Sequence, residues 1–358
     1  MKCDLQLDEL PPPAPVIAAL RQARRALLAC HEDPDPDCVG SMLALARGLA
    51  RRGVRVTTVC PDPLSTALLQ LPGAESVRAP AGLGEEGPWD TGIVVDCEPA
   101  RTRDAWPYLA SAPVVINIDH HETNDGQVGL VWVEPEAAAT GELVFAVLSA
   151  LPVELDPAMA CHLFAALQGD TGSFQFDNTK ARTLRLAAHL VELGASPGEI
   201  SQALYETREL GYVQLTGEVI RTLRRSPDGR IAWVHLTREM VERAGLRDSE
   251  VEGFVRYPRM IRGVEVALLF RETSDGRVRV SLRSRGRVDV SQLATRLGGG
   301  GHMRASGCTL AATLPEAEAR VIALVSEALR DGSLPRGEEH APDLGLSQSD
   351  QAIRADLS

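Results

Sequence analysis

The sequence predicts an α/β protein with an N-terminal doubly wound, mainly parallel sheet and a smaller C-terminal α/β domain. Short apolar runs alternate with helical patterns up to about residue 195, which is typical of a parallel sheet with crossover helices. From residue 230 the runs alternate as half-buried strands, with turn signals at Pro227-Asp-Gly229 and Ser274-Asp-Gly276. A chain of 358 residues also exceeds one ordinary core. We predict domains at 15–195 and 226–332, a helical linker at 196–225 that permits opening and closing, and a disordered polar tail at 333–358.

Each domain has its own predicted strands and helices. In the first domain we predict strands at Arg25–Cys30, Val54–Cys60, Ile93–Cys97 and Val114–Ile118. A helix of about Val39–Arg52, with Gly53 as its stop, follows the first of these strands. In the second domain we predict strands at Ile231–Leu236, Val264–Phe270 and Val278–Leu282, and a last helix of about Leu314–Arg330.

Composition limits the classes of function. The net charge of −12 argues against an extended DNA-binding surface, yet residues 254–310 hold eleven arginines against four acidic residues, a local charge of +7. No apolar run approaches the roughly 18 residues of a membrane span, and no basic and apolar leader begins the chain. The seven cysteines are scattered without a CxxC pair, which favours reduced thiols. We therefore expect a cytoplasmic protein without membrane contact.

The loop after the first predicted strand carries His31, Asp35 and Asp37. Pro34 and Pro36 restrict its backbone, so one imidazole and two carboxylates can project into one pocket. Oxygen ligands with an imidazole suit Mn²⁺ or Mg²⁺. The alternative is an acidic turn in which an aspartate caps the next helix. Capping needs one acid, however, and several close acids repel each other unless a cation neutralises them.

Three further positions repeat this pattern. Asp96 ends an apolar strand, Asp119-His120-His121 ends another, and Asp170 follows a helix and turn. All are predicted at the C-terminal edge of elements of the same sheet, where open α/β sheets bind ligands. A buried lone carboxylate such as Asp96 would be costly. For the histidine pair alone, the alternative is a loop with two solvated imidazoles.

Together these residues resemble the motifs of the DHH phosphoesterase superfamily. The matching stretches are His31-x-x-Pro34-Asp35-x-Asp37-x-x-Gly40-Ser41, Asp96, Asp119-His120-His121 and Asp170-Thr171-Gly172. The resemblance implies one metal ion held by His31, Asp35 and Asp96, and a second held by Asp37, Asp96, His120 and Asp170. It also implies that His121 faces the substrate phosphate and that Asp119 orients the histidines. Two Mn²⁺ ions are the implied cofactors, with Mg²⁺ or Co²⁺ as substitutes, and they would activate a water for attack on phosphorus.

The C-terminal part resembles the DHHA1 substrate domain of the same superfamily. Its matching stretches are Ser281-Leu-Arg283-Ser284 and Gly298-Gly299-Gly300-Gly301-His302-x-x-Ala305-Ser306-Gly307. Bare glycine backbone can approach a phosphate, Arg283 can pair with it, and His302 can add a donor. The alternative for the glycine run is a flexible loop. Two departures from the usual pattern, Met303 before Arg304 and Gln175, concern substrate choice rather than the metal ligands.

Size and domain content resemble the bacterial enzymes that degrade nanoRNA and dephosphorylate 3′-phosphoadenosine 5′-phosphate (pAp). We therefore expect a hydrolase of short RNA or DNA oligonucleotides or nucleotide bisphosphates. The main alternative is a cyclic di-AMP phosphodiesterase. A manganese pyrophosphatase, a processive exonuclease and a nucleotide sensor without turnover are weaker alternatives. α/β domains of this kind often form homodimers, and the sequence leaves the oligomeric state open.

Overall fold

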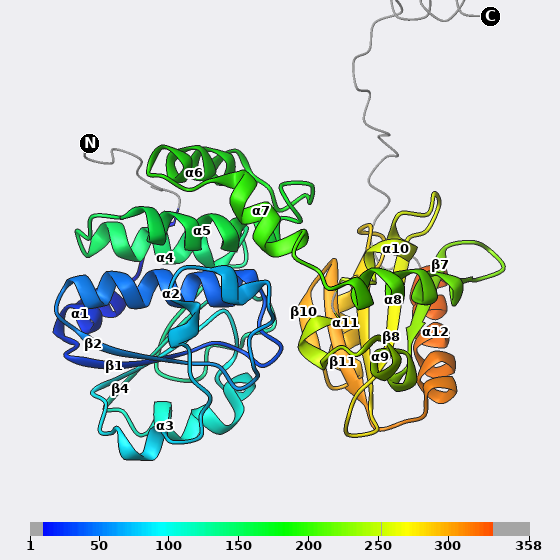
Figure 1. Ribbon diagram of the computed structural model, residues 1–358, viewed down its shortest axis with the longest axis horizontal. Helices are drawn as coiled ribbons and strands as arrows, with labels where there is room; N and C mark the ends of the chain where they lie inside the picture. The colour runs from blue at the N-terminus through cyan, green and yellow to red at the C-terminus, as the bar shows by residue number, and fades with distance from the viewer. Residues whose placement is uncertain (1–9, 252, 332–358) are drawn as a thin grey trace, which may run out of the picture.

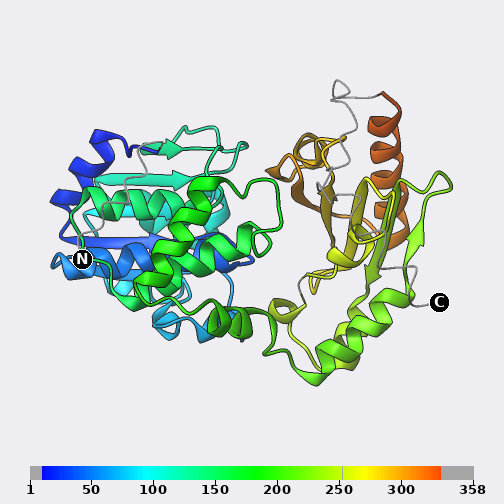
Figure 2. The ribbon, with the colours of Figure 1, turned by 90° about the horizontal axis from the view of Figure 1, so that it is seen from above.

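A computed structural model describes residues 10–251 and 253–331. They form two α/β domains that lie side by side (Figures 1 and 2). The predicted fold class is confirmed: a parallel sheet in the N-terminal domain and a mixed sheet in the C-terminal domain. The predicted tail at 333–358 lies outside the described residues. Within the described residues, every helix is too short or too polar to cross a membrane.

Five parallel strands form the N-terminal sheet, in the order β2-β1-β3-β4-β5. Their bounds are β1 Arg25–Ala29, β2 Arg55–Val59, β3 Thr91–Val95, β4 Val114–Asp119 and β5 Leu130–Val133. The bounds of the helices in this domain are α1 Ala14–Gln22, α2 Pro36–Arg51, α3 Trp106–Ala110, α4 Thr140–Ala150, α5 Pro157–Asp170, α6 Ala181–Glu192 and α7 Pro197–Tyr205. Helices α2, α4, α5 and α6 lie on one side of the sheet and α3 on the other, so the sheet is doubly wound (Figure 1).

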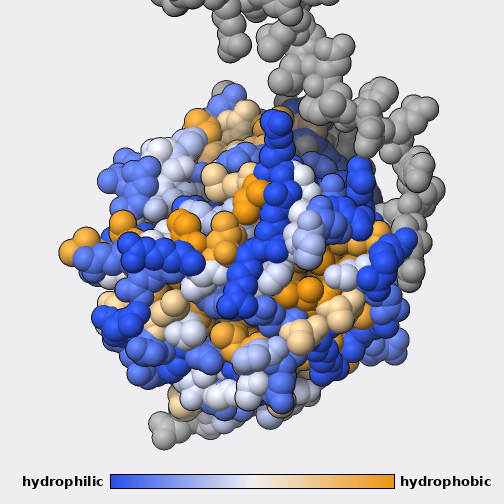
Figure 3. All heavy atoms as spheres, turned by 90° about the vertical axis from the view of Figure 1, so that its right-hand side faces the viewer, coloured by the Kyte–Doolittle hydropathy of each residue, from blue (hydrophilic) through white to orange (hydrophobic). Residues whose placement is uncertain are grey.

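Six strands form the C-terminal sheet, in the order β10-β11-β9-β8-β7-β6, with only β7 and β8 parallel. Their bounds are β6 Arg224–Arg225, β7 Ile231–Leu236, β8 Val266–Glu272, β9 Val278–Ser284, β10 Gly300–His302 and β11 Ala305–Leu310. The bounds of the helices are α8 Leu210–Arg221, α9 Arg238–Ala244, α10 Arg256–Arg259, α11 Val290–Arg296 and α12 Leu314–Asp331. Hydrophilic side chains cover much of the end of the molecule that this domain forms, with smaller hydrophobic patches between them (Figure 3).

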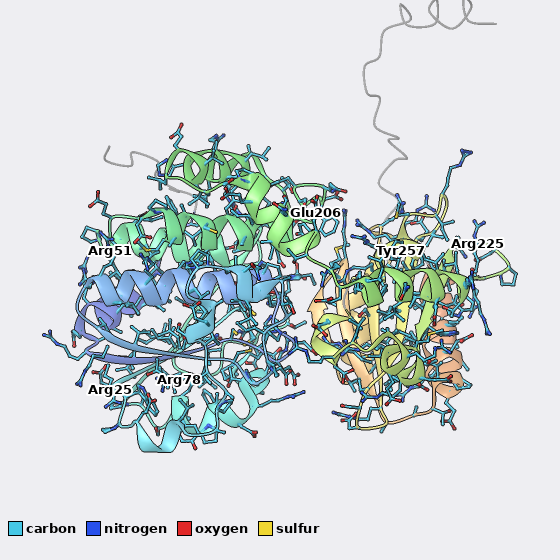
Figure 4. The ribbon with its side chains drawn as sticks, in the orientation of Figure 1. Arg25, Arg51, Arg78, Glu206, Arg225 and Tyr257 are labelled. Carbon is cyan, nitrogen blue, oxygen red and sulfur yellow. The ribbon has the colours of Figure 1, made fainter. Side chains whose placement is uncertain are left out.

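The segment predicted as a linker contains two helices that pack with different domains. Ile200 and Leu204 of α7 are buried in the core of the N-terminal domain. Leu215 and Val219 of α8 are buried with β7 and β8 in the C-terminal domain. Glu206 marks the short connection between the two helices (Figure 4). On this packing we propose that the domain boundary lies at 206–209.

Several details differ from the sequence prediction. Helix α2 begins at Pro36 rather than near Val39, because Asp35 caps it and proline suits the first helical position. Strand β3 ends at Val95, because Asp96 turns into the left-handed region with φ +64°. Asp170 is the last residue of helix α5, which covers the sheet and is not an element of it. Strands β5, β6, β10 and β11 were not predicted, and all four are short or rich in small residues.

Candidate metal centre and substrate cleft

The loop between β1 and α2 places its two aspartates differently. Asp35 is the N-cap of α2, and its Oδ1 accepts a hydrogen bond from the Cys38 backbone N–H at 2.9 Å. Asp37 lies one residue inside the helix and is fully buried. Its carboxylate accepts the backbone N–H groups of Thr140 at 2.7 Å and Gly141 at 3.0 Å. The positive N-terminal end of α4 therefore holds this carboxylate in place.

Asp96 lies between the two groups of predicted ligands. Its Oδ2 is 3.5 Å from Nε2 of His31, and its Oδ1 is 3.5 Å from Nε2 of His120. The Thr140 hydroxyl donates to Oδ1 at 2.8 Å, which fixes the orientation of the carboxylate. One buried carboxylate thus presents one oxygen to each histidine.

His120 points its Nε2 into the acidic cluster. Its Nδ1 lies 3.1 Å from the carbonyl oxygen of Ala137, so the Nδ1–H donates there and Nε2 faces the carboxylates. That Nε2 is 3.1 Å from Asp170 Oδ2 and 3.6 Å from Asp37 Oδ2. It is buried and has no hydrogen-bond partner. Burial lowers the pKa of His120, but the close contact and charge of Asp170, with the charges of Asp96 and Asp37, raise it well above its ordinary value. The cluster therefore favours positive charge at this position, which a bound cation would supply.

Asp119 holds the histidine pair from behind. It is fully buried and accepts hydrogen bonds from His120 N–H at 2.7 Å and from Nδ1 of His121 at 2.7 Å. Asn124 donates to the other Asp119 oxygen at 2.7 Å and to Asn117 Oδ1 at 2.8 Å. No role was predicted from the sequence for Asn117 or Asn124. Asn117 carried a signal, since it is a polar residue inside the apolar run of β4.

Electrostatics favour a bound cation at this cluster. Burial, and then the neighbouring Asp96 and Asp170, raise the pKa of Asp37 well above its ordinary value. Burial also raises the pKa of Asp170, although His120 opposes the shift. Among the described residues, two of four possible donor groups contain the predicted ligands: His31 with Asp35, Cys38 and Asp96, and Asp37 with Asp96 and His120. The predicted ligand Asp170 is in none of the four groups, although its Oδ2 lies 3.1 Å from His120 Nε2. The donor set of carboxylates and imidazoles therefore fits divalent cations such as Mn²⁺ or Mg²⁺.

His302 of the second domain reaches this centre. Its ring stacks on His121 with centroids 4.3 Å apart and an interplanar angle of 20°, and it lies 4.6 Å from the ring of His120. Burial, and then the charges of His121 and His120, hold the pKa of His302 well below its ordinary value. Its Nε2 is buried without a hydrogen-bond partner. The C-terminal domain therefore closes one side of the centre with a neutral imidazole.

The other predicted substrate residues lie on strands beside His302. Arg283 is half-buried on β9 and pairs in register with Ala305. Ser284 is buried, and its hydroxyl accepts the Gly286 N–H at 2.9 Å. Gly299 precedes β10, while Gly300 and Gly301 are part of that strand and pair with Gly307 and Ser306 of β11. The second half of the glycine run is therefore part of a strand, and Gly298 and Gly299 form the connection that leads into it.

Ion pairs join the two domains around the cleft. Asp33 pairs with Arg279 and lies 3.9 Å from Arg271, both in the C-terminal sheet. Arg304 pairs with Asp177, which follows the Asp170-Thr-Gly motif. A cavity of about 330 Å³ lies between the domains beside Asp33, Arg279 and Thr309. The described conformation is thus one in which the domains touch.

Comparisons with known proteins agree with this arrangement. The model of the DHH family N-terminal domain matches residues 25–167, and that of the DHHA1 domain matches residues 234–331. A Thermus thermophilus protein named bifunctional oligoribonuclease and PAP phosphatase is 35% identical over 84% of this chain and 89% of its own length. A Bacillus subtilis protein of the same name is 29% identical over 79% of this chain and 88% of its own. The crystal structure of an exopolyphosphatase-related protein from Bacteroides fragilis has a TM-score of 0.78 at 24% identity, covering 88% of this chain and 94% of that one. This last likeness concerns the fold alone.

Proposed function

Because this chain belongs to the DHH family of phosphoesterases with a C-terminal DHHA1 domain, we propose that it hydrolyses very short RNA to mononucleotides and pAp to AMP and phosphate. Two relatives with these activities in their names cover most of the chain. We assign two divalent cations, preferably Mn²⁺, to the centre described above. Substrates would enter between the two domains.

The position of Asp96 is the observation that carries this proposal. Its two carboxylate oxygens face His31 and His120 at equal distances of 3.5 Å. One cation would be held by His31, Asp35 and Asp96, and the other by Asp37, Asp96, His120 and Asp170. Four carboxylates then balance two divalent charges. When bound, the cations would supply the Lewis acidity that activates water for attack on a phosphate ester.

The residues around the centre have separate tasks in this proposal. His121 donates its Nδ1–H to Asp119, which leaves Nε2 of the same ring for the substrate phosphate. Asp119 and Asn124 hold that imidazole in one tautomer and one orientation. His302 and Arg283 approach the phosphate from the second domain. This division of labour lets one domain perform the chemistry and the other select the substrate.

Short substrates fit this arrangement for a physical reason. The domains already touch through Asp33 with Arg279 and through Arg304 with Asp177, on elements that flank the centre. A long strand would have to separate these contacts, while a bisphosphate or a few nucleotides would not. The excess of arginine in residues 254–310 supplies the attraction that a nearly neutral metal centre lacks.

A single substrate panel tests the proposal. The full chain with Mn²⁺ is incubated with pAp, labelled RNAs from a dinucleotide to a 24-mer, cyclic di-AMP and pyrophosphate, and products are separated by chromatography. We expect turnover of pAp and of the shortest RNAs, decreasing with length. Faster hydrolysis of cyclic di-AMP than of pAp or RNA would favour the alternative phosphodiesterase. Absence of turnover on the whole panel would overturn the enzymatic assignment.

A further inference from the structure

Cys38 lies among the ligands assigned to the first cation. One donor atom from each of His31, Asp35, Cys38 and Asp96 lies within 4.8 Å of the other three. Cys38 is fully buried, although it belongs to a polar loop and helix start. The proposed function uses His31, Asp35 and Asp96 at this position and gives no task to the sulfur. Three protein ligands leave a cation open at a fourth position.

The local backbone orients the Cys38 sulfur toward this position. Cys38 is the third residue of α2, and the backbone N–H of Asp35 donates to its Sγ at 3.3 Å. The Cys38 S–H group in turn contacts the Asp35 carbonyl oxygen at 3.5 Å. These two contacts hold the Cys38 sulfur at the N-terminal end of a 16-residue helix, beside the Asp35 carboxylate. The same loop fixes the Asp35 carboxylate and the Cys38 thiol together.

We propose that Cys38 is a fourth ligand of the cation held by His31, Asp35 and Asp96, and that it shifts this position toward thiophilic ions such as Zn²⁺, Cd²⁺ or Co²⁺. The inference rests on the proposed function, which assigns a cation to these residues. On binding, the S–H bond breaks, a metal–sulfur bond forms, and the proton passes to solvent. A thiolate beside two carboxylates and one imidazole is a softer donor set than that of the second position, which holds oxygen and nitrogen only.

Cobalt substitution tests the ligand directly, without an activity readout. The full chain is freed of metal with a chelator and loaded with Co²⁺, and its near-ultraviolet absorption is recorded. We expect a thiolate-to-cobalt charge-transfer band in the natural chain and its loss in Cys38→Ser. Cys60→Ser is the matched control. Its thiol is also buried and donates to the His31 carbonyl oxygen at 3.5 Å, but it is outside the donor group, so the band should remain.

Metal affinity gives a second measurement. We expect Cys38→Ser to weaken Cd²⁺ binding about tenfold or more by calorimetry, with a smaller change for Mn²⁺. Cys38→Ala serves the same purpose if the serine variant does not fold. A natural chain without the charge-transfer band, or a band that survives in the Cys38 variants, would overturn the inference. A band that depends on Cys38, in a chain that hydrolyses none of the substrate panel, would sustain the ligand and reject the proposed function.

Discussion

At the scale of single residues, the candidate metal centre contains two aspartates whose backbone conformation is unfavourable for a residue with a side chain. Asp96 has φ +64° and Asp33 has φ +52°, both in the left-handed region that costs a residue with a side chain about 1–2 kcal/mol. Aspartate and asparagine tolerate this region better than most residues. Asp37 and Asp96 are also buried, with carboxylate oxygens within 4.8 Å of each other. Such a site is expected to gain stability when a cation binds.

The first prediction concerns the shared carboxylate. Asp96→Asn keeps the left-handed backbone but removes the charge that faces both His31 and His120. At a hundredfold excess of Mn²⁺ over its dissociation constant, the natural chain should gain about 2.7 kcal/mol of stability. The variant should lose that gain, while its metal-free melting temperature should stay equal or rise because one buried charge is gone. Differential scanning calorimetry with and without Mn²⁺ measures both quantities, and a variant that keeps the full Mn²⁺ gain contradicts the assignment.

The second prediction concerns pH and His162, which lies on α5. Burial lowers the pKa of His162 to about 4, and its Nε2–H donates to the Pro72 carbonyl oxygen at 2.7 Å. Since the unfolded chain protonates near pH 6.5 and the folded chain does not, stability is complete above that pH and falls as pH decreases toward 4. Between pH 7 and pH 5, protonation of this histidine in the unfolded chain should lower the free energy of unfolding by about 2 kcal/mol.

His162→Gln tests this linkage, because it keeps a donor for Pro72 and removes the titration. Urea unfolding of the metal-free chain measures how much unfolding free energy is lost between pH 7 and pH 5. This loss should be smaller by about 2 kcal/mol in the variant. Equal pH dependence in the natural chain and His162→Gln would contradict the prediction.

Candidate site residues could be found from the sequence where they interrupt an apolar pattern. Residues whose role depends on tertiary packing could not be found in this way. Asp35, Asp37, Asp96 and the histidine pair stood out because each ends a predicted strand or begins a helix. Thr140 gave no such signal. Its backbone N–H binds Asp37 across 103 residues of sequence, and its hydroxyl binds Asp96. That role exists only because the N-terminal end of α4 lies against α2, which is a product of tertiary packing.

At the scale of elements, close contact between strands accounts for part of the glycine run. A Cβ atom on Gly299 would lie 2.1 Å from the Gly307 carbonyl oxygen and 2.6 Å from the Cys308 Cβ. Gly301 has φ +130° and faces Ser306 at comparable distances. Composition could not distinguish a flexible loop from a tightly packed hairpin, since both tolerate glycine. The hairpin matters for function because β10 carries His302 at its end.

The third prediction therefore compares two neighbouring glycines. Gly299→Ala should destabilise the C-terminal domain by about 1–3 kcal/mol, because backbone and Cβ atoms must move to admit the methyl group. Gly300→Ala is the matched control, since its nearest contact is Thr123 Oγ1 at 3.4 Å. Urea unfolding measures the difference between the two variants. Equal stability of both variants would contradict the prediction, because it would show that the hairpin backbone shifts to admit the methyl group at little cost.

At the scale of the whole molecule, two domains with separate cores share one site. Each core is complete within its own domain, so the relative position of the domains depends on the polar contacts between them. Asp33 stands out among these contacts, because it lies between His31 and Asp35 in sequence and pairs with Arg279 of the other domain. Domain contact and the loop that carries the proposed ligands His31 and Asp35 are thereby joined through one side chain.

The last prediction is that Asp33→Asn opens the cleft. Asparagine accepts the left-handed φ of +52°, so the loop is kept while the ion pair with Arg279 and the charge near Arg271 are lost. Removing one partner leaves the partly buried Arg279 guanidinium without this counter-charge, which costs more than the loss of an exposed ion pair. The variant should show a larger radius of gyration by X-ray scattering and a raised KM for pAp, with a smaller effect on kcat. Asp275→Asn is the matched control beside the same cavity, because Asp275 pairs only with Arg277 of its own hairpin among the described ion pairs. If both variants scatter alike and share one KM, the position of the domains does not depend on Asp33, and closure must be driven by substrate.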